Sequence, residues 1–106
     1  MTDKRIVLST AGSEDEARTI AHHLVEHQLA ACVNLVPRVE SIYRWQGKVE
    51  SSQEWLLLIK TTAEKFPAVR DAIRELHSYE LPECIAISVE EGSAEYLEWI
   101  AGSLQA

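Results

Sequence analysis

Apolar residues change their spacing several times along the chain, and each change marks the boundary of a predicted element. Residues 4–11, KRIVLSTA, form a short apolar run that predicts a strand. Through residues 12–28 the apolar positions fall three and four apart, as they do in an amphipathic helix. Ser13 followed by Glu16 has the spacing of a capping box, so we expect the helix to begin there.

A long β-hairpin is predicted next. Residues 31–45, ACVNLVPRVESIYRW, are rich in β-branched and aromatic side chains, and a turn over 46–50 separates them from a second apolar stretch at 51–62. The run LLLI at 56–59 is apolar at consecutive positions, which predicts a central strand covered on both faces. Pro37 has no N–H to donate to a neighbouring strand, so the first hairpin strand is expected at a sheet edge or with a bulge.

The last part of the chain predicts helix, strand and helix. Apolar positions between residues 63 and 77 are again three or four apart, which indicates a second helix. A short strand at 84–92 places Ile85 and Ile87 on one face. Residues 93–104 have the spacing of a third, amphipathic helix.

The order β-α-β-β-α-β-α predicts an α+β fold. It matches a ferredoxin-like, split βαβ sheet with one extra C-terminal helix. Right-handed crossovers place the first and third strands at the centre of that sheet and the second strand at an edge. The 106 residues are enough for one core and too few for two, so residues 1–106 are expected to form a single domain.

The length of the hairpin predicts an oligomer. An unbroken strand over residues 31–45 would reach about 50 Å at about 3.3 Å per residue, whereas a compact chain of this size has a radius of gyration of about 13 Å. The hairpin must therefore bend or protrude. Because a protruding edge strand with unpaired backbone groups tends to pair with another chain, we expect a homo-oligomer joined through the hairpin.

The charge and the apolar content exclude several classes of protein. The formal net charge of −7 argues against nucleic acid or an anionic membrane as the main partner, since either would repel this surface. The longest aliphatic run is LLLI, which is too short for a secretory signal or a membrane span. Cys32 and Cys84 lie far apart within apolar segments, which is typical of reduced thiols in the cytoplasm.

Three segments together are similar to those of a known family. ACVN at residues 31–34, IYRWQGK at 42–48 and HSYELPE at 77–83 occur in the order and spacing found in the CutA family of divalent-cation tolerance proteins. The resemblance extends from Ile6 to Ile100.

This resemblance implies a ferredoxin-like protomer in a homotrimer, similar in architecture to the PII signalling proteins, with edge hairpins that bridge neighbouring chains. It also implies a role in tolerance of copper and other divalent cations, and no established enzymatic activity. Five positions depart from the family pattern: Ser9, Arg38, Arg44, Leu76 and Ser78. Two of them bear on metal binding, because Ser9 stands where some members carry cysteine and Leu76 stands where some carry a second histidine. Each of these two departures removes a candidate metal ligand.

His77, Glu83 and Cys32 are the candidate metal ligands. Imidazole, carboxylate and thiolate groups all serve as ligands for ions such as Cu²⁺ or Zn²⁺. The segment 77–83 supplies too few of them for a metal centre, so a trimer would gather the rest from a neighbouring chain. The alternative is that His77 and Glu83 make structural hydrogen bonds in a stiff connector and that Cys32 packs as a small hydrophobic residue.

Trp45, Glu54, Lys60 and Tyr79 are the candidate lining of a ligand-binding cleft, which the resemblance implies lies between subunits. Glu54 and Lys60 are six residues apart on one strand, so both side chains point to the same face. They would bracket a small anionic or zwitterionic ligand, with Trp45 as a flat apolar wall. The alternative is an ion-pair network at the subunit interface that sets the register of the trimer.

His23 and His27 are one helical turn apart, which is a spacing that allows two imidazoles to chelate one ion. They fall beside the apolar stripe of the first helix with Glu26 between them. This pattern favours a solvated acidic face with incidental histidines over a metal site.

The leading functional hypothesis is a cytoplasmic homotrimer that binds divalent metal ions, copper foremost, and takes part in metal tolerance. The alternative is a PII-like signalling adaptor that binds a small metabolite in clefts between subunits and contacts a protein partner. We do not expect an enzyme, because no nucleophile elbow, phosphate-binding loop or metalloprotease spacing is present in the sequence.

Overall fold

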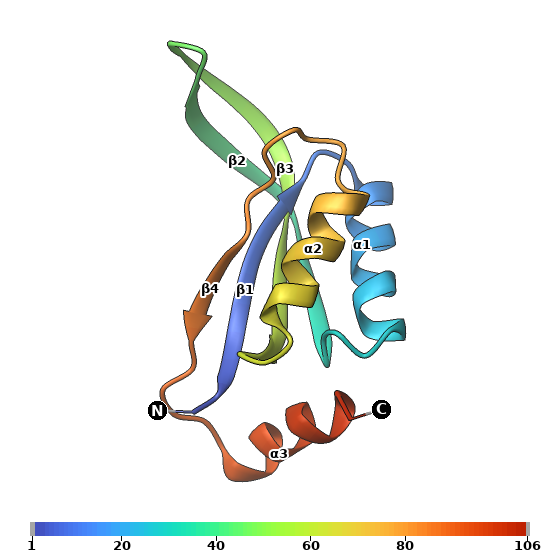
Figure 1. The fold of residues 1–106 in the computed structure, drawn as a ribbon. Helices are drawn as coiled ribbons and strands as arrows, with labels where there is room; N and C mark the ends of the chain where they lie inside the picture. The colour runs from blue at the N-terminus through green and yellow to red at the C-terminus, as the bar shows by residue number, and fades with distance from the viewer. Residues whose placement is uncertain (1, 106) are drawn as a thin grey trace.

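The elements of the chain follow the predicted order β-α-β-β-α-β-α (Figure 1). The computed structural model describes residues 2–105. Its elements are β1 (Lys4–Ala11), α1 (Glu14–Glu26), β2 (Cys32–Trp45), β3 (Lys48–Thr62), α2 (Phe66–Leu76), β4 (Ile85–Ser88) and α3 (Ala94–Ser103). Within these residues, no helix is both long enough and apolar enough to cross a bilayer.

The strands form one sheet in the order β2-β3-β1-β4, with antiparallel neighbours throughout. This confirms the predicted ferredoxin-like arrangement, since the first and third strands are central and the second is at an edge. Val7 at the centre of β1 pairs with Ile59 of β3 on one side and with Ala86 of β4 on the other.

The helices begin where the local sequence favours a start. Ser13 caps α1, because its side-chain oxygen accepts a hydrogen bond from the backbone N–H of Glu16 at 3.2 Å. Pro67 lies in the first turn of α2, where a backbone N–H has no acceptor within the helix. The missing N–H of proline therefore costs no helix hydrogen bond there. Ser93 caps α3 in the same way as Ser13 caps α1.

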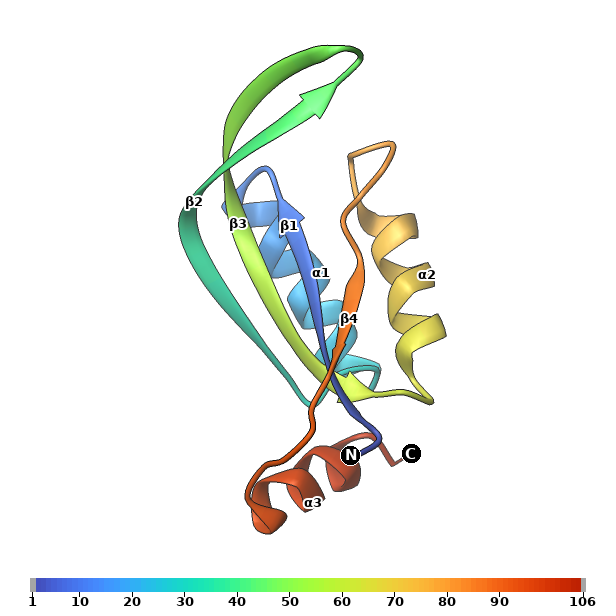
Figure 2. The same ribbon diagram turned by 90° about the vertical axis from the view of Figure 1, so that its left-hand side faces the viewer.

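The β2–β3 hairpin projects well beyond the rest of the sheet (Figures 1 and 2), and the longest dimension of the molecule is 44 Å. The pairing of β2 with β3 shifts register between Val36 and Val39, so a bulge occurs at Pro37 as predicted. At the tip, Gln46 and Gly47 both have positive φ angles, 51° and 81°. Such a two-residue turn matches the twist of the flanking strands.

The core lies between one face of the sheet and the two helices α1 and α2, which pack side by side (Figure 2). Leu57 and Ile59 of β3 are fully buried on this face. On the opposite face Ile85 and Ile87 of β4 remain 55% and 49% exposed. The prediction that LLLI is covered on both faces is therefore wrong for the single chain, because helices pack against only one face and Leu56 and Leu58 stay half-buried.

Candidate functional site

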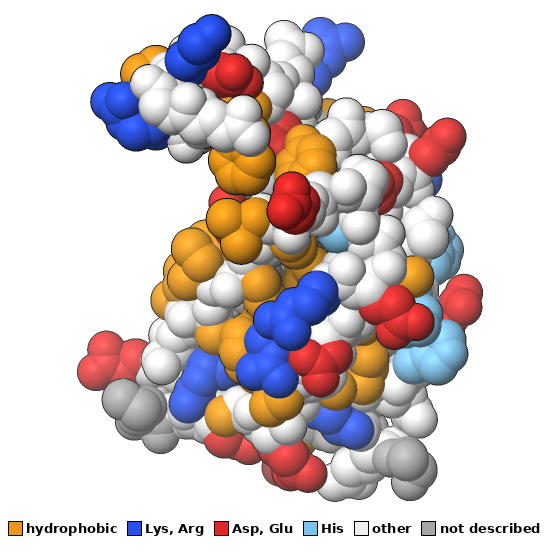
Figure 3. Space-filling view, turned by 45° about the horizontal axis from the view of Figure 1, so that its top comes forward, with side chains coloured by type: hydrophobic (Ala, Val, Ile, Leu, Met, Phe, Trp, Pro, Cys, Tyr) orange, Lys and Arg blue, Asp and Glu red, His pale blue; other side chains and the backbone are white. Residues whose placement is uncertain are grey.

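A cleft of about 800 Å³ opens where the outer half of the hairpin faces the connector between α2 and β4. The space-filling view shows the hairpin overhanging this hollow, with apolar and acidic side chains below it (Figure 3). The lining residues come from β1, from both hairpin strands and from the connector: Thr10, Ser41, Ile42, Tyr43, Trp45, Glu50, Glu54, Tyr79, Glu80, Leu81, Pro82 and Glu83.

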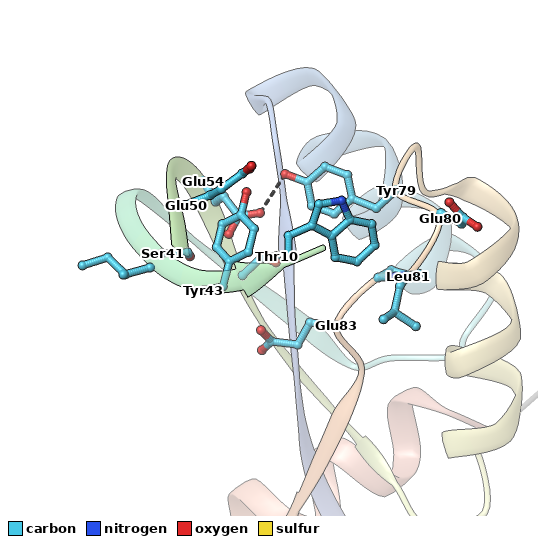
Figure 4. A pocket seen from close by; sticks show the side chains of 12 residues that line it. Thr10, Ser41, Tyr43, Glu50, Glu54, Tyr79, Glu80, Leu81 and Glu83 are labelled. Atoms are coloured by element: carbon cyan, nitrogen blue, oxygen red, sulfur yellow. Dashed lines mark hydrogen bonds between the residues drawn. The ribbon is translucent and has the colours of Figure 1, made fainter. Parts of the chain in front are cut away.

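Tyr79 and Glu54 join the connector to the hairpin across this cleft (Figure 4). The Tyr79 hydroxyl donates a hydrogen bond of 2.7 Å to Glu54 Oε2, and Glu54 is only 6% exposed. Burial and this bond to the carboxylate raise the pKa of Tyr79 to about 12. The phenol therefore stays protonated and keeps donating throughout the physiological pH range.

Gly12 makes room for the Tyr79 ring. A Cβ atom at this position would lie 3.0 Å from the Tyr79 hydroxyl oxygen and 3.6 Å from the nearest ring carbons. Glycine at the end of β1 thus allows the phenol to reach Glu54 without steric conflict.

The cleft is strongly acidic. Four glutamates line it, Glu50, Glu54, Glu80 and Glu83, and its lining includes no lysine, arginine or histidine within residues 2–105. The pKa of Glu83 is raised, first because the carboxyl is partly buried and then because of the charge on Glu54. A cation in the cleft would relieve this repulsion, whereas an anionic ligand would add to it.

Glu83→Gln is expected to stabilise the protein at pH 7. Because the folded state raises the pKa of Glu83 above its usual 4.5, folding favours the protonated carboxyl. The stability that the protonated Glu83 carboxyl contributes is fully present below pH 4.5 and is lost as the pH rises through the folded-state pKa. The ionised carboxylate therefore opposes folding at neutral pH. Urea unfolding should show a gain for the variant at pH 7 that shrinks at pH 4. An equal gain at pH 7 and pH 4 would contradict this account. Glu40→Gln, on the exposed edge of the same hairpin, is the control.

His77 is buried below the cleft and does not line it. Its Nε2 donates to the Thr10 carbonyl oxygen at 2.6 Å, and its Nδ1 accepts from the Tyr79 backbone N–H at 3.0 Å. Glu16 Oε1 lies 3.2 Å from Nδ1 and is itself buried with no hydrogen-bond partner. With both ring nitrogens engaged, His77 is not available to a metal ion, and it instead holds the start of the connector against β1.

Cys32 and Lys60 lie away from the cleft. Cys32 of β2 pairs with Lys60 of β3. Lys60 is six residues from Glu54 along β3, a distance of roughly 20 Å. Lys60 Nζ lies 5.6 Å from the centre of the Tyr96 ring and borders a separate cavity of about 180 Å³. Glu54 and Lys60 therefore share a face of β3 but do not bracket one ligand within a single chain.

The predicted metal ligands do not converge in one chain. Glu83 borders the cleft, His77 is buried behind it, and Cys32 sits near the opposite end of the sheet. Across residues 2–105 no three side chains of histidine, cysteine, aspartate or glutamate gather in a metal-binding arrangement. The set His77, Glu83 and Cys32 thus does not fit a single metal centre of this chain.

The predicted cleft residues Trp45, Glu54 and Tyr79 do come together, and sequence reasoning missed several of their neighbours. Tyr43 lies two residues before Trp45 on the same strand face, and it pairs with Glu50 across the hairpin. The hairpin register would have indicated both residues once the Gln46–Gly47 turn was placed.

The fold defines a small ferredoxin-like protein with an extended edge hairpin that overhangs an acidic cleft. The chain belongs to the family described as CutA1 divalent ion tolerance protein, whose model matches residues 5–103. This confirms the family resemblance seen in the sequence.

Three proteins illustrate the similarity. The divalent-cation tolerance protein CutA of Thermus thermophilus is 53% identical over 97 residues, covering 92% of this chain and 94% of that protein. Protein CutA of Homo sapiens is 47% identical over 91 residues, which cover 86% of this chain and 51% of the human protein, so this chain spans about half its length. A solved structure described as the periplasmic divalent cation tolerance protein CutA from Archaeoglobus fulgidus superposes with a TM-score of 0.94 at 41% identity, covering 96% of this chain and 99% of that one.

Proposed function

We propose that this protein acts in divalent-cation tolerance by binding the cation in its acidic cleft, as a homotrimer in the cytoplasm. The cation is the ligand on which the protein acts rather than a resident cofactor. Membership of the CutA1 family supports the role in divalent-ion tolerance. The geometry of this chain supports the cleft as the place where binding occurs.

The observation that carries this proposal is that four glutamates line one cleft with no basic side chain among its described lining residues. Glu54 is almost completely buried and has no basic partner among the ion pairs of the described chain. Its charge contributes to the raised pKa of Glu83, so the two carboxyl groups sense each other across the cleft. Two carboxylates held together without a counter-charge bind a divalent ion because the ion removes the repulsion.

Copper is the first ion to test. For a site built from oxygen or nitrogen donors, affinity among divalent first-row metals rises to a maximum at Cu²⁺. Two carboxylates leave coordination positions open, and water or a group from a neighbouring chain of the trimer would fill them.

Titration of Cu²⁺ into chelator-stripped protein, followed by calorimetry, tests the proposal. We expect a saturable cleft site in each chain, with an affinity weakened about tenfold or more by Glu83→Gln and by Glu54→Gln. The second substitution keeps an acceptor for the Tyr79 hydroxyl, so it changes charge more than structure. Glu40→Gln should leave the affinity unchanged, since Glu40 lies on the same hairpin outside the cleft. Uptake that is indifferent to both cleft variants would refute a cation site there.

A homotrimer is supported by two surfaces of the chain. The outer edge of β2 borders no other strand of the sheet, and the face of β4 opposite the helices exposes Ile85 and Ile87. Ile42 and Val49 on the hairpin are 70% and 66% exposed. Edge backbone and exposed apolar area together are the features that neighbouring chains cover in a closed assembly.

The cytoplasm and a binding role without catalysis remain part of the proposal. Cys32 and Cys84 are free thiols, a state that a reducing compartment maintains. The imidazole of His77, the most versatile acid–base group of the connector, is bonded to backbone atoms rather than presented to a ligand. The free thiols favour a cytoplasmic location. The engagement of His77 favours a binding role over catalysis.

A PII-like adaptor that binds a small metabolite is the second candidate. The aromatic rings of Tyr43, Trp45 and Tyr79 line the cleft beside the glutamates, and its volume suits a small organic molecule. The absence of basic residues from the described lining disfavours the anionic ligand expected from Glu54 and Lys60. If copper uptake does not depend on the cleft glutamates, a neutral or cationic metabolite becomes the better candidate for the ligand of the cleft.

A further inference from the structure

The C-terminal end of α1 and its capping residue carry three of the four histidines of the chain, His22, His23 and His27. Figure 3 shows histidine side chains beside acidic ones on one flank of the molecule, away from the overhanging hairpin. This group is not part of the cleft, and neither the fold nor the proposed function uses it. Its geometry is specific enough to suggest a second site.

The imidazoles of His23 and His27 lie face to face. Their ring centres are 4.1 Å apart and their planes are inclined by 26°. The two residues are one helical turn apart, so the backbone already holds the rings on the same side of α1. Side chains at this spacing can direct one nitrogen of each ring at a common ion once the rings turn out of the stack.

A hydrogen bond fixes which nitrogen of His27 is free. His27 Nδ1 lies 2.9 Å from the carbonyl oxygen of His23. Because a carbonyl oxygen only accepts, Nδ1 must carry the proton and donate it. In the neutral imidazole this leaves the lone pair on Nε2, and a backbone carbonyl is a common partner for the second nitrogen of a metal-binding histidine.

The local charge favours a cation at this position. His27 is the C-terminal cap of α1, where the helix dipole places partial negative charge. Glu26 lies between the two histidines in sequence, and its carboxylate is 3.7 Å from Nδ1 of His22. The chain as a whole carries a formal charge of −7.

We propose that His23 and His27 form a two-histidine site for a divalent cation with a preference for imidazole ligands, such as Cu²⁺, Ni²⁺ or Zn²⁺. The protein contributes two nitrogens and water fills the remaining positions. The site lies at the C-terminal end of α1, with His27 exposed and His23 partly buried, and it is distinct from the acidic cleft, so each chain presents one nitrogen site and one oxygen site. This inference goes beyond the proposed function and does not depend on it.

Electron paramagnetic resonance of Cu²⁺ bound to the chelator-stripped protein tests this site. Nitrogen ligands give hyperfine couplings that a carboxylate cleft lacks. We expect these couplings at one equivalent of Cu²⁺ or less, and we expect His23→Gln and His27→Gln each to remove them and to weaken nitrogen-coordinated binding at least tenfold. His22→Gln is the matched control, because His22 lies on the same helix beside Glu26, and it should change the affinity less than twofold.

Nitrogen couplings that persist in both His23→Gln and His27→Gln would overturn the site. So would an equal loss in His22→Gln, because that would indicate loose binding to any histidine of the helix. Glu83→Gln separates this inference from the cleft, since it should leave the nitrogen couplings intact. Circular dichroism of each variant verifies that α1 is still folded. Because His23 lies within the helix, His23→Gln still tests the site even if His27→Gln loosens the helix end.

Discussion

Replacing His77 by alanine is expected to lower the free energy of unfolding by about 3 kcal/mol. The substitution removes two hydrogen bonds, leaves the carbonyl of Thr10 without its buried donor, and opens a cavity behind the connector. Urea denaturation followed by circular dichroism measures the change. Wild type and variant must be compared at equal chain concentration, because the stability of an oligomer depends on it.

Two further variants make this experiment decisive. His77→Gln keeps an amide that donates to Thr10 and a carbonyl oxygen that accepts from Tyr79, so it should lose less stability than His77→Ala. His22→Ala removes a histidine that is 71% exposed and should stay within about 0.5 kcal/mol of wild type. A value for His77→Ala as small as that of His22→Ala would show that the buried imidazole is not a structural anchor.

Replacing Ile87 by lysine is expected to abolish assembly while leaving the protomer folded. Ile87 is 49% exposed in the single chain, so a charge there has little effect on the fold of one protomer. If neighbouring chains cover this face, the same charge becomes buried and unpaired, which costs about 3–5 kcal/mol per chain. Light scattering after size-exclusion chromatography should give about 36 kDa for wild type, three chains of 11.9 kDa, and a single chain for the variant.

Val25→Lys is the control for the assembly experiment. Val25 is 42% exposed on α1, on the helical side of the sheet, so lysine there should leave the mass unchanged. A wild-type mass of 11.9 kDa at micromolar concentration would refute the homotrimer. A trimer that tolerates Ile87→Lys would instead place the contacts elsewhere, with the edge of β2 as the remaining surface.

Much of the fold was predictable because it depends on local patterns. The change from helical to alternating spacing located the elements, and Pro37 marked both the edge strand and its bulge. The open face of β4 was harder to foresee. Alternation places Ile85 and Ile87 on one face, but it does not say whether a helix, solvent or another chain covers that face.

The candidate site was predictable only where strand geometry determines it. Trp45, Glu54 and Tyr79 line one cleft of the single chain, since the hairpin and the connector converge at one end of the sheet. Lys60 does not meet them, because a period of two determines the face of a residue and not its position along the strand. The burial of His77 depends on a hydrogen bond to Thr10, 67 residues away, and no local pattern reveals such a contact.

The close approach of Gly12 to Tyr79 links the end of β1 to the contact between the connector and the hairpin. Alanine at position 12 would bring its methyl group 3.0 Å from the Tyr79 oxygen, whereas the ring carbons lie 3.6 Å away. Phenylalanine at position 79 removes the crowded atom, and with it the bond to Glu54. A side chain at position 12 would thus push the Tyr79 hydroxyl away from Glu54, so the size of residue 12 controls whether the connector stays bonded to the hairpin.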